Sequence, residues 1–315
     1  MKRKTYVVTG GAGFIGSRMV AGLNRRGDDR IVVLDRLGSD ERWRNLQGLA
    51  FDDILDKDDL RRRLRDGTAP DADVVIHEGA CSDTTERDAS YLLDNNYRFS
   101  MELCRWSLEH GARFVYASSA ATYGDGALGY SDDDKVTPRL RPLNMYGFSK
   151  QLFDLQALRR GWFDRIAGLK YFNVYGPGEA HKGDMRSVIH KAFGQVRETG
   201  RVALFKSYRP DLADGEQERD FVFVKDAVAV TLYLCDHPQA SGLFNCGTGT
   251  ARTWNDLARA VFAAMGRAPR IEYIDMPEAL RPKYQYHTCA EMGKLRAAGY
   301  EAAFTSLEDG VREYV

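Results

Sequence analysis

Short apolar runs alternate with amphipathic stretches along the first part of the chain. Residues 17–26 place Met19, Val20 and Leu23 on one helical face, which predicts an amphipathic helix. Strands are predicted before and after it, over Thr5–Val8, Ile31–Leu34, Val74–Ile76 and Phe114–Tyr116. Strands that are apolar throughout and are separated by helices indicate a parallel sheet covered on both faces. The pattern therefore predicts a doubly wound α/β fold.

The later part of the chain predicts a second, smaller domain that is discontinuous in sequence. Leu169–Phe172 extends the first sheet, after which prolines, glycines and polar loops become frequent. Residues 221–224 and 243–245 are apolar again, and they predict short returns to the first domain. We expect a first domain over residues 1–175 with returns at about 221–249, and a smaller α/β domain that binds the substrate over residues 176–220 and 250–315.

Composition and charge exclude several classes of protein. The chain of 315 residues has 45 basic and 45 acidic residues, so it has no electrostatic reason to bind nucleic acid or an acidic membrane over a broad face. Its 43% hydrophobic and 29% charged residues are ordinary for a globular protein. The five scattered cysteines favour neither a disulfide framework nor a metal site. No apolar run approaches the roughly 18 residues of a membrane span, and we expect a cytoplasmic protein.

A glycine-rich segment, Thr9–Gly16, lies between the first predicted strand and the first predicted helix. Its glycines Gly10, Gly13 and Gly16 let the backbone turn tightly and approach a pyrophosphate, to which the helix N-terminus offers free N–H groups. Asp35 ends the second strand 19 residues beyond Gly16, where a carboxylate accepts hydrogen bonds from a ribose. Together these features predict a Rossmann-type dinucleotide-binding domain.

The residues after Asp35 bear on the choice between NAD and NADP. The carboxylate of Asp35 by itself favours NAD. Arg36 follows at once and Arg42 soon after, and guanidinium groups in these places could bind the 2′-phosphate of NADP. The residues alone leave open that these arginines face water. We expect NADP, with NAD as the alternative.

Three further residues form a candidate catalytic group. Tyr146 and Lys150 open a predicted helix and lie one turn apart on one face, while Ser119 ends the fourth predicted strand. A tyrosine acts as a general base at neutral pH only if its pKa falls below the ordinary value of about 10. A nearby ammonium and the charge of a nicotinamide lower it, and a serine hydroxyl can hold the reacting oxygen.

The glycine segment, Ser119, Tyr146 and Lys150 together resemble the extended short-chain dehydrogenase/reductase family, over nearly the whole chain. Within it, six stretches resemble the ADP-L-glycero-D-manno-heptose 6-epimerase branch: His77–Ser82, Asp94–Tyr97, Tyr116–Gly124, Tyr171–Pro177, His181–Gly183 and Leu295–Tyr300. The fourth is shared by most members that act on sugar nucleotides, whereas the first and fifth are more particular to the branch. The resemblance implies epimerisation at C6 of an ADP-heptose for lipopolysaccharide core synthesis, and a homo-oligomer, the pentamer of that branch.

The resemblance also implies the residues of the site. The catalytic residues would be Tyr146, Lys182, Lys150 and Ser119. The cofactor would contact Gly10, Gly13, Phe14, Ile15, Gly16, Asp35, Arg36, Arg42, Lys57, Glu78, Gly79, Ala80, Cys81, Ser82, Asn95, Lys150, Val174 and Lys182. The sugar nucleotide would contact Asn173, Asp184, Lys191, Phe205, Lys206, Ser207, Tyr208, Arg219 and Tyr284. Asp184 and Lys191 depart from the residues usual in the branch, as does Arg36, and they leave the nucleotide base and the fine sugar contacts open.

Other functions remain as alternatives. A sugar-nucleotide 4,6-dehydratase needs an acid and a base directly after the serine of the fourth strand, where this chain has Ala120 and Ala121. A hexose 4-epimerase shares Ser119 and Tyr146 but has no use for a lysine at position 182. A regulator that binds the cofactor without catalysis usually lacks the tyrosine or the lysine, and this chain has both. Another nucleotide-sugar epimerase or reductase is the main alternative.

Overall fold

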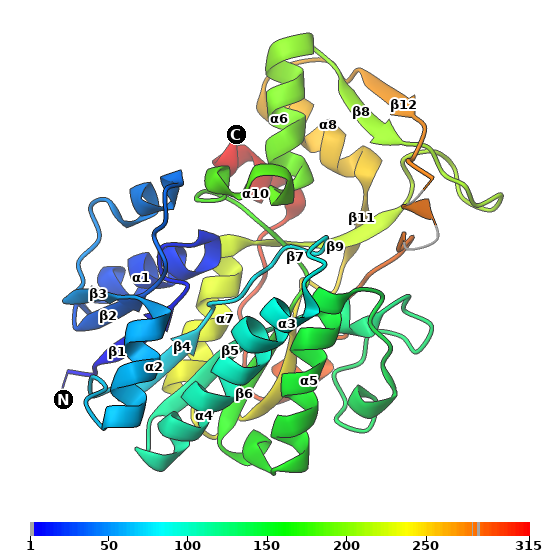
Figure 1. The fold of residues 1–315 in the computed structure, drawn as a ribbon. Helices are drawn as coiled ribbons and strands as arrows, with labels where there is room; N and C mark the ends of the chain where they lie inside the picture. Colours follow the sequence, from blue (N-terminus) through cyan, green and yellow to red (C-terminus); the bar gives the residue numbers. More distant parts are fainter. Residues whose placement is uncertain (1–2, 279, 282–283) are drawn as a thin grey trace.

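A seven-stranded sheet forms the centre of the first lobe of the molecule (Figure 1). The computed structural model describes residues 3–278, 280–281 and 284–315. The strands of the sheet are β1 (Tyr6–Thr9), β2 (Ile31–Leu34), β3 (Asp53–Leu55), β4 (Val74–His77), β5 (Arg113–Ser119), β6 (Ile166–Tyr171) and β10 (Gly242–Cys246). They lie in the order β10-β6-β5-β4-β1-β2-β3, and every pair is parallel. This arrangement confirms the predicted doubly wound α/β fold.

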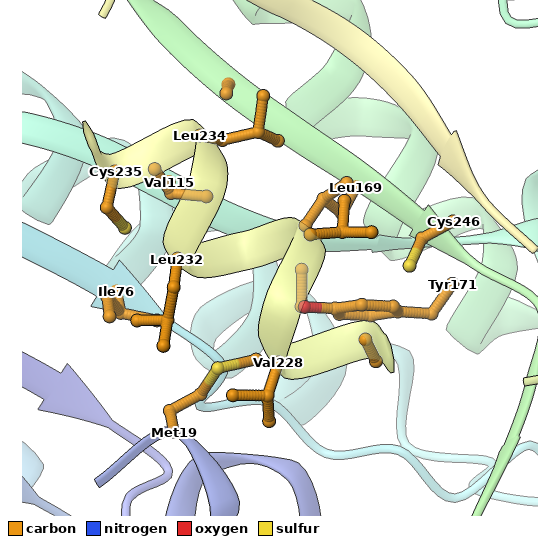
Figure 2. Packing of buried hydrophobic residues seen from close by; sticks show 14 of the residues in the cluster. Met19, Ile76, Val115, Leu169, Tyr171, Val228, Leu232, Leu234, Cys235 and Cys246 are labelled. Atoms are coloured by element: carbon orange, nitrogen blue, oxygen red, sulfur yellow. The ribbon is translucent and has the colours of Figure 1, made fainter. Parts of the chain in front are cut away.

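Helices cover both faces of this sheet. One face packs against α1 (Phe14–Arg25) and α7 (Val224–Asp236), and the other against α2 (Lys57–Asp66), α4 (Phe99–Glu109) and α5 (Met145–Arg159). Alternate residues of a strand enter opposite cores: in β4, Ile76 belongs to the core under α1 and α7, and Val75 to the other. Figure 2 shows Val228 and Leu232 of α7 directed toward Met19 and Ile76.

The second lobe has two small sheets and its own hydrophobic core. One sheet joins β7 (Asn173–Tyr175), β9 (Glu218–Phe223) and β11 (Ala251–Thr253), and the other joins β8 (Val202–Phe205) and β12 (Ile271–Ile274). The helices of this part are α6 (Val188–Thr199), α8 (Trp254–Ala264) and α10 (Leu307–Tyr314), while α9 (Gly293–Ala297) lies against β10. No helix among the described residues is long and apolar enough to cross a bilayer.

One of the two predicted return strands does not join the large sheet. Residues 243–245 lie in β10, as expected, but residues 221–223 lie in β9, which pairs with β7 and β11. The reason is the packing of its side chains, since Phe221 and Phe223 enter the core of the second lobe. The return to the first lobe therefore begins with α7, directly after β9.

A buried ion pair fixes α5 against the sheet behind the end of β5. The side chains of Asp154 on α5 and Lys170 on β6 are fully buried, with Nζ and Oδ2 4.0 Å apart. The hydroxyls of Tyr116 and Ser118 each donate a hydrogen bond of 2.7 Å to the Asp154 carboxylate. The Lys170 ammonium also donates to the hydroxyl of Thr122 at 2.8 Å. The strand end that carries Ser119 is thus tied to the helix that carries Tyr146 and Lys150.

Replacing Asp154 by leucine is expected to lower the free energy of unfolding by about 3 kcal/mol, because it removes the main counter-charge of the buried Lys170 ammonium. Adding Lys170→Met to Asp154→Leu should recover part of that loss, since it removes the unpaired ammonium while the hydroxyls of Tyr116 and Ser118 still lack their acceptor. Urea denaturation followed by circular dichroism measures both effects. A double variant no more stable than Asp154→Leu would contradict the electrostatic explanation.

Candidate active site

The glycine segment forms a tight loop between β1 and α1. Gly10 has a φ of +64°, and a Cβ at Gly16 would lie 2.1 Å from the carbonyl oxygen of Gly10, so neither position accepts a side chain. The amide of Gly13 donates to the same oxygen at 2.9 Å. The helix α1 begins at Phe14 with no side-chain cap from any described residue. Its first N–H groups are therefore available to an anion such as a pyrophosphate, and the loop fits a dinucleotide.

A cavity of about 910 Å³ opens at this loop, at the carboxyl edge of the large sheet. It lies where the strand order reverses between β1 and β4, which is where open α/β sheets bind ligands. All of the predicted catalytic and cofactor residues line it: Gly10, Gly13, Phe14, Ile15, Gly16, Asp35, Arg36, Arg42, Lys57, Glu78, Gly79, Ala80, Cys81, Ser82, Asn95, Ser119, Tyr146, Lys150, Val174 and Lys182. Residues from both lobes thus meet in one cavity.

Most of the predicted substrate residues lie outside the walls of this cavity. Asn173 is the member of that set that lines it. Those that do not are Asp184, Lys191, Phe205, Lys206, Ser207, Tyr208, Arg219 and Tyr284. The ammonium of Lys191 donates to the main-chain oxygen of Asp184 at 2.7 Å, and both residues are exposed. Lys206 and Tyr208 both hydrogen bond to Asp275 at the end of the β8–β12 sheet, at 3.1 and 3.2 Å.

Arg219 lies one layer behind the cavity, between two aromatic rings. Its guanidinium carbon is 5.4 Å from the ring centre of Trp254, which lines the cavity, and 5.2 Å from that of Tyr284. The side chain is 7% exposed, and its described hydrogen bonds go to the carbonyl oxygens of Glu218 and Gln285. Among the described residues no carboxylate forms an ion pair with it.

Asp35 is turned toward the glycine loop. Its Oδ2 accepts a hydrogen bond from the amide of Ala12 at 2.9 Å, and its Oδ1 accepts one from the amide of Arg36 at 2.8 Å. Arg42 approaches Oδ1 at 3.4 Å and binds Asp40 with two nitrogen atoms. Burial raises the pKa of Asp35, and the two amides and Arg42 oppose that shift. Arg36 is exposed at the rim of the cavity.

Ser119, Tyr146 and Lys150 meet where β5 ends and α5 begins. The hydroxyl of Ser119 accepts the amide of Ala121 at 3.1 Å, and Asn144 caps α5 by accepting the amide of Gly147 at 2.8 Å. The Lys150 ammonium donates to the carbonyl of Ala117 at 2.8 Å. Burial raises the pKa of Tyr146, and its hydrogen bond with Ser119 acts in the opposite direction. Desolvation of the phenolate is the larger of these two effects, so a lowered pKa at Tyr146 requires a further positive charge beside it, such as that of a nicotinamide.

Glu78 is a buried carboxyl group beside Lys150. Its Oε1 accepts the hydroxyl of Tyr171 at 2.9 Å. Burial raises the pKa of Glu78 to about 7, while Tyr171 and the Lys150 charge oppose the shift. Burial also lowers the pKa of Lys150 to about 8, and the charge of Glu78 opposes this change. Burial thus brings the pKa values of the two groups closer together.

Lys182 enters the same cavity from the segment between β7 and α6. It lies in a 3₁₀ helix over Ala180–Met185, and its Nζ is 5.5 Å from the centre of the Phe14 ring. Burial lowers the pKa of Lys182, and the charge of Glu179 opposes the shift. Within the described parts of the chain no acceptor forms a hydrogen bond with this ammonium. A half-buried lysine without an acceptor and with a lowered pKa is suited to exchange a proton with a ligand.

Sequence reasoning missed several residues that hold the site together. Asn96 lies in a π-helical turn, Leu93–Arg98, and it bonds both the amide and the carbonyl of Cys81, at 2.8 and 3.0 Å. Thr9 accepts the amide of Gly79 at 2.8 Å. Trp254 lines the cavity from the second lobe. Asn96 follows the predicted Asn95 directly. Nothing in a single sequence indicates that a side chain forms hydrogen bonds with the backbone of another segment, so Asn96 was not predicted.

Comparisons with known proteins agree with this geometry. Residues 6–247 match the model of the NAD dependent epimerase/dehydratase family. The ADP-L-glycero-D-manno-heptose-6-epimerase of Nitratidesulfovibrio vulgaris (Hildenborough) is 60% identical over 98% of this chain and 96% of its own length. The enzyme of that name from Helicobacter pylori has a solved structure with a TM-score of 0.84 and 28% identity, covering 99% of this chain and 95% of that one.

A third relative was solved with a cofactor. The UDP-glucose 4-epimerase of Thermus thermophilus, in complex with NAD, has a TM-score of 0.75 and 26% identity, over 98% of this chain and 97% of that one. The glycine loop fits such a nicotinamide dinucleotide, and the family match covers more than half of the chain. The chain therefore belongs to the NAD dependent epimerase/dehydratase family, within the branch of the ADP-L-glycero-D-manno-heptose-6-epimerases.

Proposed function

We propose that this chain inverts C6 of the heptose in ADP-D-glycero-D-manno-heptose to give ADP-L-glycero-D-manno-heptose, a precursor of the lipopolysaccharide core. The relatives of that name support the substrate. The observation that carries the proposal is the presence of two separate basic side chains, Tyr146 and Lys182, in the cavity that begins at the glycine loop.

The substrate makes simple proton abstraction too difficult. C6 of the heptose is a secondary alcohol with no carbonyl beside it, so its C–H bond is not acidic. When bound, the nicotinamide cofactor supplies a place to which hydride leaves and from which it returns. C6 is then the carbonyl carbon of a ketone. The ketone must present its opposite face to the returning hydride before it is reduced. The two epimers place their hydroxyl groups on different sides, and one base does not easily serve both.

Tyr146 and Lys182 are assigned as the two bases. Lys150, held by the carbonyl of Ala117, stabilises the phenolate of Tyr146 for one epimer. Lys182 takes or gives the proton for the other epimer, because burial lowers its pKa and no described residue accepts a hydrogen bond from it. Ser119 and Asn173 hold the oxygen of the intermediate while it rotates about the C5–C6 bond. Both side chains belong to residues that line the cavity with Tyr146 and Lys182.

Arg219 is assigned to the diphosphate of the sugar nucleotide. It is a buried cation with carbonyl oxygens and aromatic rings around it but no carboxylate among the described residues, so its charge remains available to an anion. Its planar guanidinium can donate two parallel hydrogen bonds to phosphate oxygens. The ring of Tyr284 lies beside this guanidinium, and the loop of Phe205, Lys206, Ser207 and Tyr208 would complete the nucleotide site.

NADP is the preferred cofactor in this proposal. Both oxygens of Asp35 already accept hydrogen bonds from the chain, which leaves the carboxylate less able to accept those of an unmodified ribose. Arg36 and Arg42 line the same end of the cavity and offer positive charge to a 2′-phosphate. A cytoplasmic location and a pentamer, both expected from the sequence, complete the proposal.

A UDP-hexose 4-epimerase is the competing function. It would use Ser119, Tyr146 and Lys150 in the same way, but it leaves Lys182 without a role. Lys182 lies in the cavity over Phe14, close to the glycine loop, and not on the outer surface. That position favours the heptose epimerase.

Tyr146→Phe and Lys182→Met should each lower the rate of epimerisation at least about 1,000-fold, because each removes one of two bases that act in series. The cofactor should remain bound and the fold intact. Conversion of ADP-heptose followed by NMR measures the loss, with Lys135→Met, an exposed lysine, as the control. Near-normal epimerisation by Lys182→Met would exclude the two-base mechanism and favour a hexose 4-epimerase.

Arg36→Glu should weaken NADP binding by about 100-fold and NAD binding by less than about threefold, since only NADP has the additional phosphate that a new negative charge repels. Titration of each cofactor against the protein stripped of dinucleotide gives the two dissociation constants. An equal change for both cofactors would show that this arginine faces water.

Arg219→Met should raise the KM for the sugar nucleotide by about 100-fold or more while cofactor binding stays the same, because the phosphate charge loses its partner. Arg219→Lys should recover only part of this loss, since an ammonium does not donate two parallel hydrogen bonds. Steady-state kinetics of both variants tests the assignment. A KM that stays unchanged in Arg219→Met would place the diphosphate elsewhere.

A further inference from the structure

Asn45 connects the glycine loop with the segment that carries Lys182. It lies in the 3₁₀ helix Glu41–Leu46, outside the lining of the cavity. Its side-chain nitrogen is 3.0 Å from the carbonyl oxygen of Ala12 and 3.0 Å from that of Gly178. The same nitrogen is 3.3 Å from Nδ1 of His181. One amide group thus joins the loop before α1 to the chain four residues before the proposed base.

Two other contacts join this segment to the first lobe: the hydroxyl of Thr84 donates to the sulfur of Met185 at 3.9 Å, and the Lys182 ammonium lies over the Phe14 ring. Gly178 has a φ of +103°, so its backbone adopts a conformation that is common only for glycine. At the far end, the buried carboxylate of Glu179 accepts the hydroxyl of Ser187 at 2.6 Å, which is a contact within the segment itself. The amide of Lys182 donates to the carbonyl of Glu179 at 3.0 Å. Among the described residues, Asn45 supplies the hydrogen bonds shorter than 3.5 Å that reach this segment from the first lobe, to Gly178 and His181.

The helix of Asn45 is itself held firmly. Asp40 caps its N-terminus by accepting the amide of Arg42 at 2.9 Å, and Leu46 at its end is buried in the core under α1. Arg42, on the same helix, faces the adenosine end of the cavity. Asn45 therefore lies on a short helix that is held at both ends and stands beside the proposed cofactor site.

We propose that Asn45 is a positioning residue, which sets the place of Lys182 through its hydrogen bonds to Ala12 and Gly178. This inference rests on the proposed function, because it takes Lys182 as one of the two bases. The chemistry of the contact requires an amide nitrogen, because all three neighbouring atoms can act as acceptors. Aspartate has the same shape but offers only oxygen atoms, which these neighbours repel. A displacement of about 1 Å at a base can cost about 100-fold in rate.

The first test measures the oxidation of each epimer separately. A single turnover of each ADP-heptose epimer by protein with bound NADP is followed by the absorbance of the reduced nicotinamide. Asn45→Asp should slow, at least tenfold, the same epimer that Lys182→Met slows. The other epimer, which depends on Tyr146, should change less than about threefold. Affinity for NADP should also stay within about threefold.

A matched control is available in α1. Asn24 donates its side-chain amide to two carbonyl oxygens, those of Asp28 at 3.0 Å and Ala50 at 2.9 Å, and it does not touch the segment of Lys182. Asn24→Asp makes the same chemical change in a bridge of the same kind. It should reduce stability without any preference between the two epimers, which separates positioning from a general loss of structure.

A second measurement does not depend on activity. Hydrogen–deuterium exchange of the peptide over residues 178–187, in the protein without cofactor, should be faster in Asn45→Asp than in the original chain and unchanged in Asn24→Asp. Unchanged exchange in Asn45→Asp, or equal slowing of both epimers, would overturn the proposal. If Lys182→Met slows neither epimer, the two-base function fails, and exchange alone then decides whether Asn45 fixes this segment.

Discussion

The backbone contacts of the glycine loop leave no space for a side chain, and the position of the cavity depends on this constraint. A Cβ at Gly10 would lie 2.8 Å from the Cα atom of Gly79, and one at Gly16 would reach the carbonyl oxygen of Gly10. The end of β1, the start of α1 and the end of β4 are therefore in direct contact. Because β1 and β4 lie where the strand order reverses, the residues after each of them turn into one cavity.

Burial then shifts the pKa values of the ionisable groups in that cavity. It lowers the pKa of Lys150 and of Lys182, because a low-polarity environment disfavours the ammonium. Their surroundings differ in one respect. Lys150 donates to a backbone carbonyl, whereas Lys182 has no acceptor among the described residues, and each has the charge of a glutamate nearby. Lys150 is thus suited to stabilise a neighbouring phenolate, and Lys182 to exchange a proton itself.

The sequence predicted the first lobe well because its strands are continuous apolar runs and its loop has glycines at fixed spacing. It misplaced residues 221–223, since an apolar strand does not reveal which of two cores its side chains enter. It missed β3 (Asp53–Leu55) and β11 (Ala251–Thr253), which are three residues long and partly exposed. Many lining residues of the cavity were predicted because they lie in stretches that resemble the family, such as the glycine segment and the residues after β4. Asn45 and Asn96 were not, because a side chain that bonds a distant backbone has no pattern in the sequence.

The path of the chain explains why the two proposed bases come from different parts of the molecule. A doubly wound sheet presents its ligand site at an open edge, so α5 and the strand ends supply only one side of the cavity. After β6 the chain leaves the large sheet through β7, and the segment with Lys182 lies between β7 and α6. It returns only with α7 and β10. A reaction that must treat two faces of one carbon needs bases on different walls, and this detour provides the second wall. The position of Lys182 then depends on a few hydrogen bonds between the lobes, because no strand pairing among the described residues connects it to the large sheet.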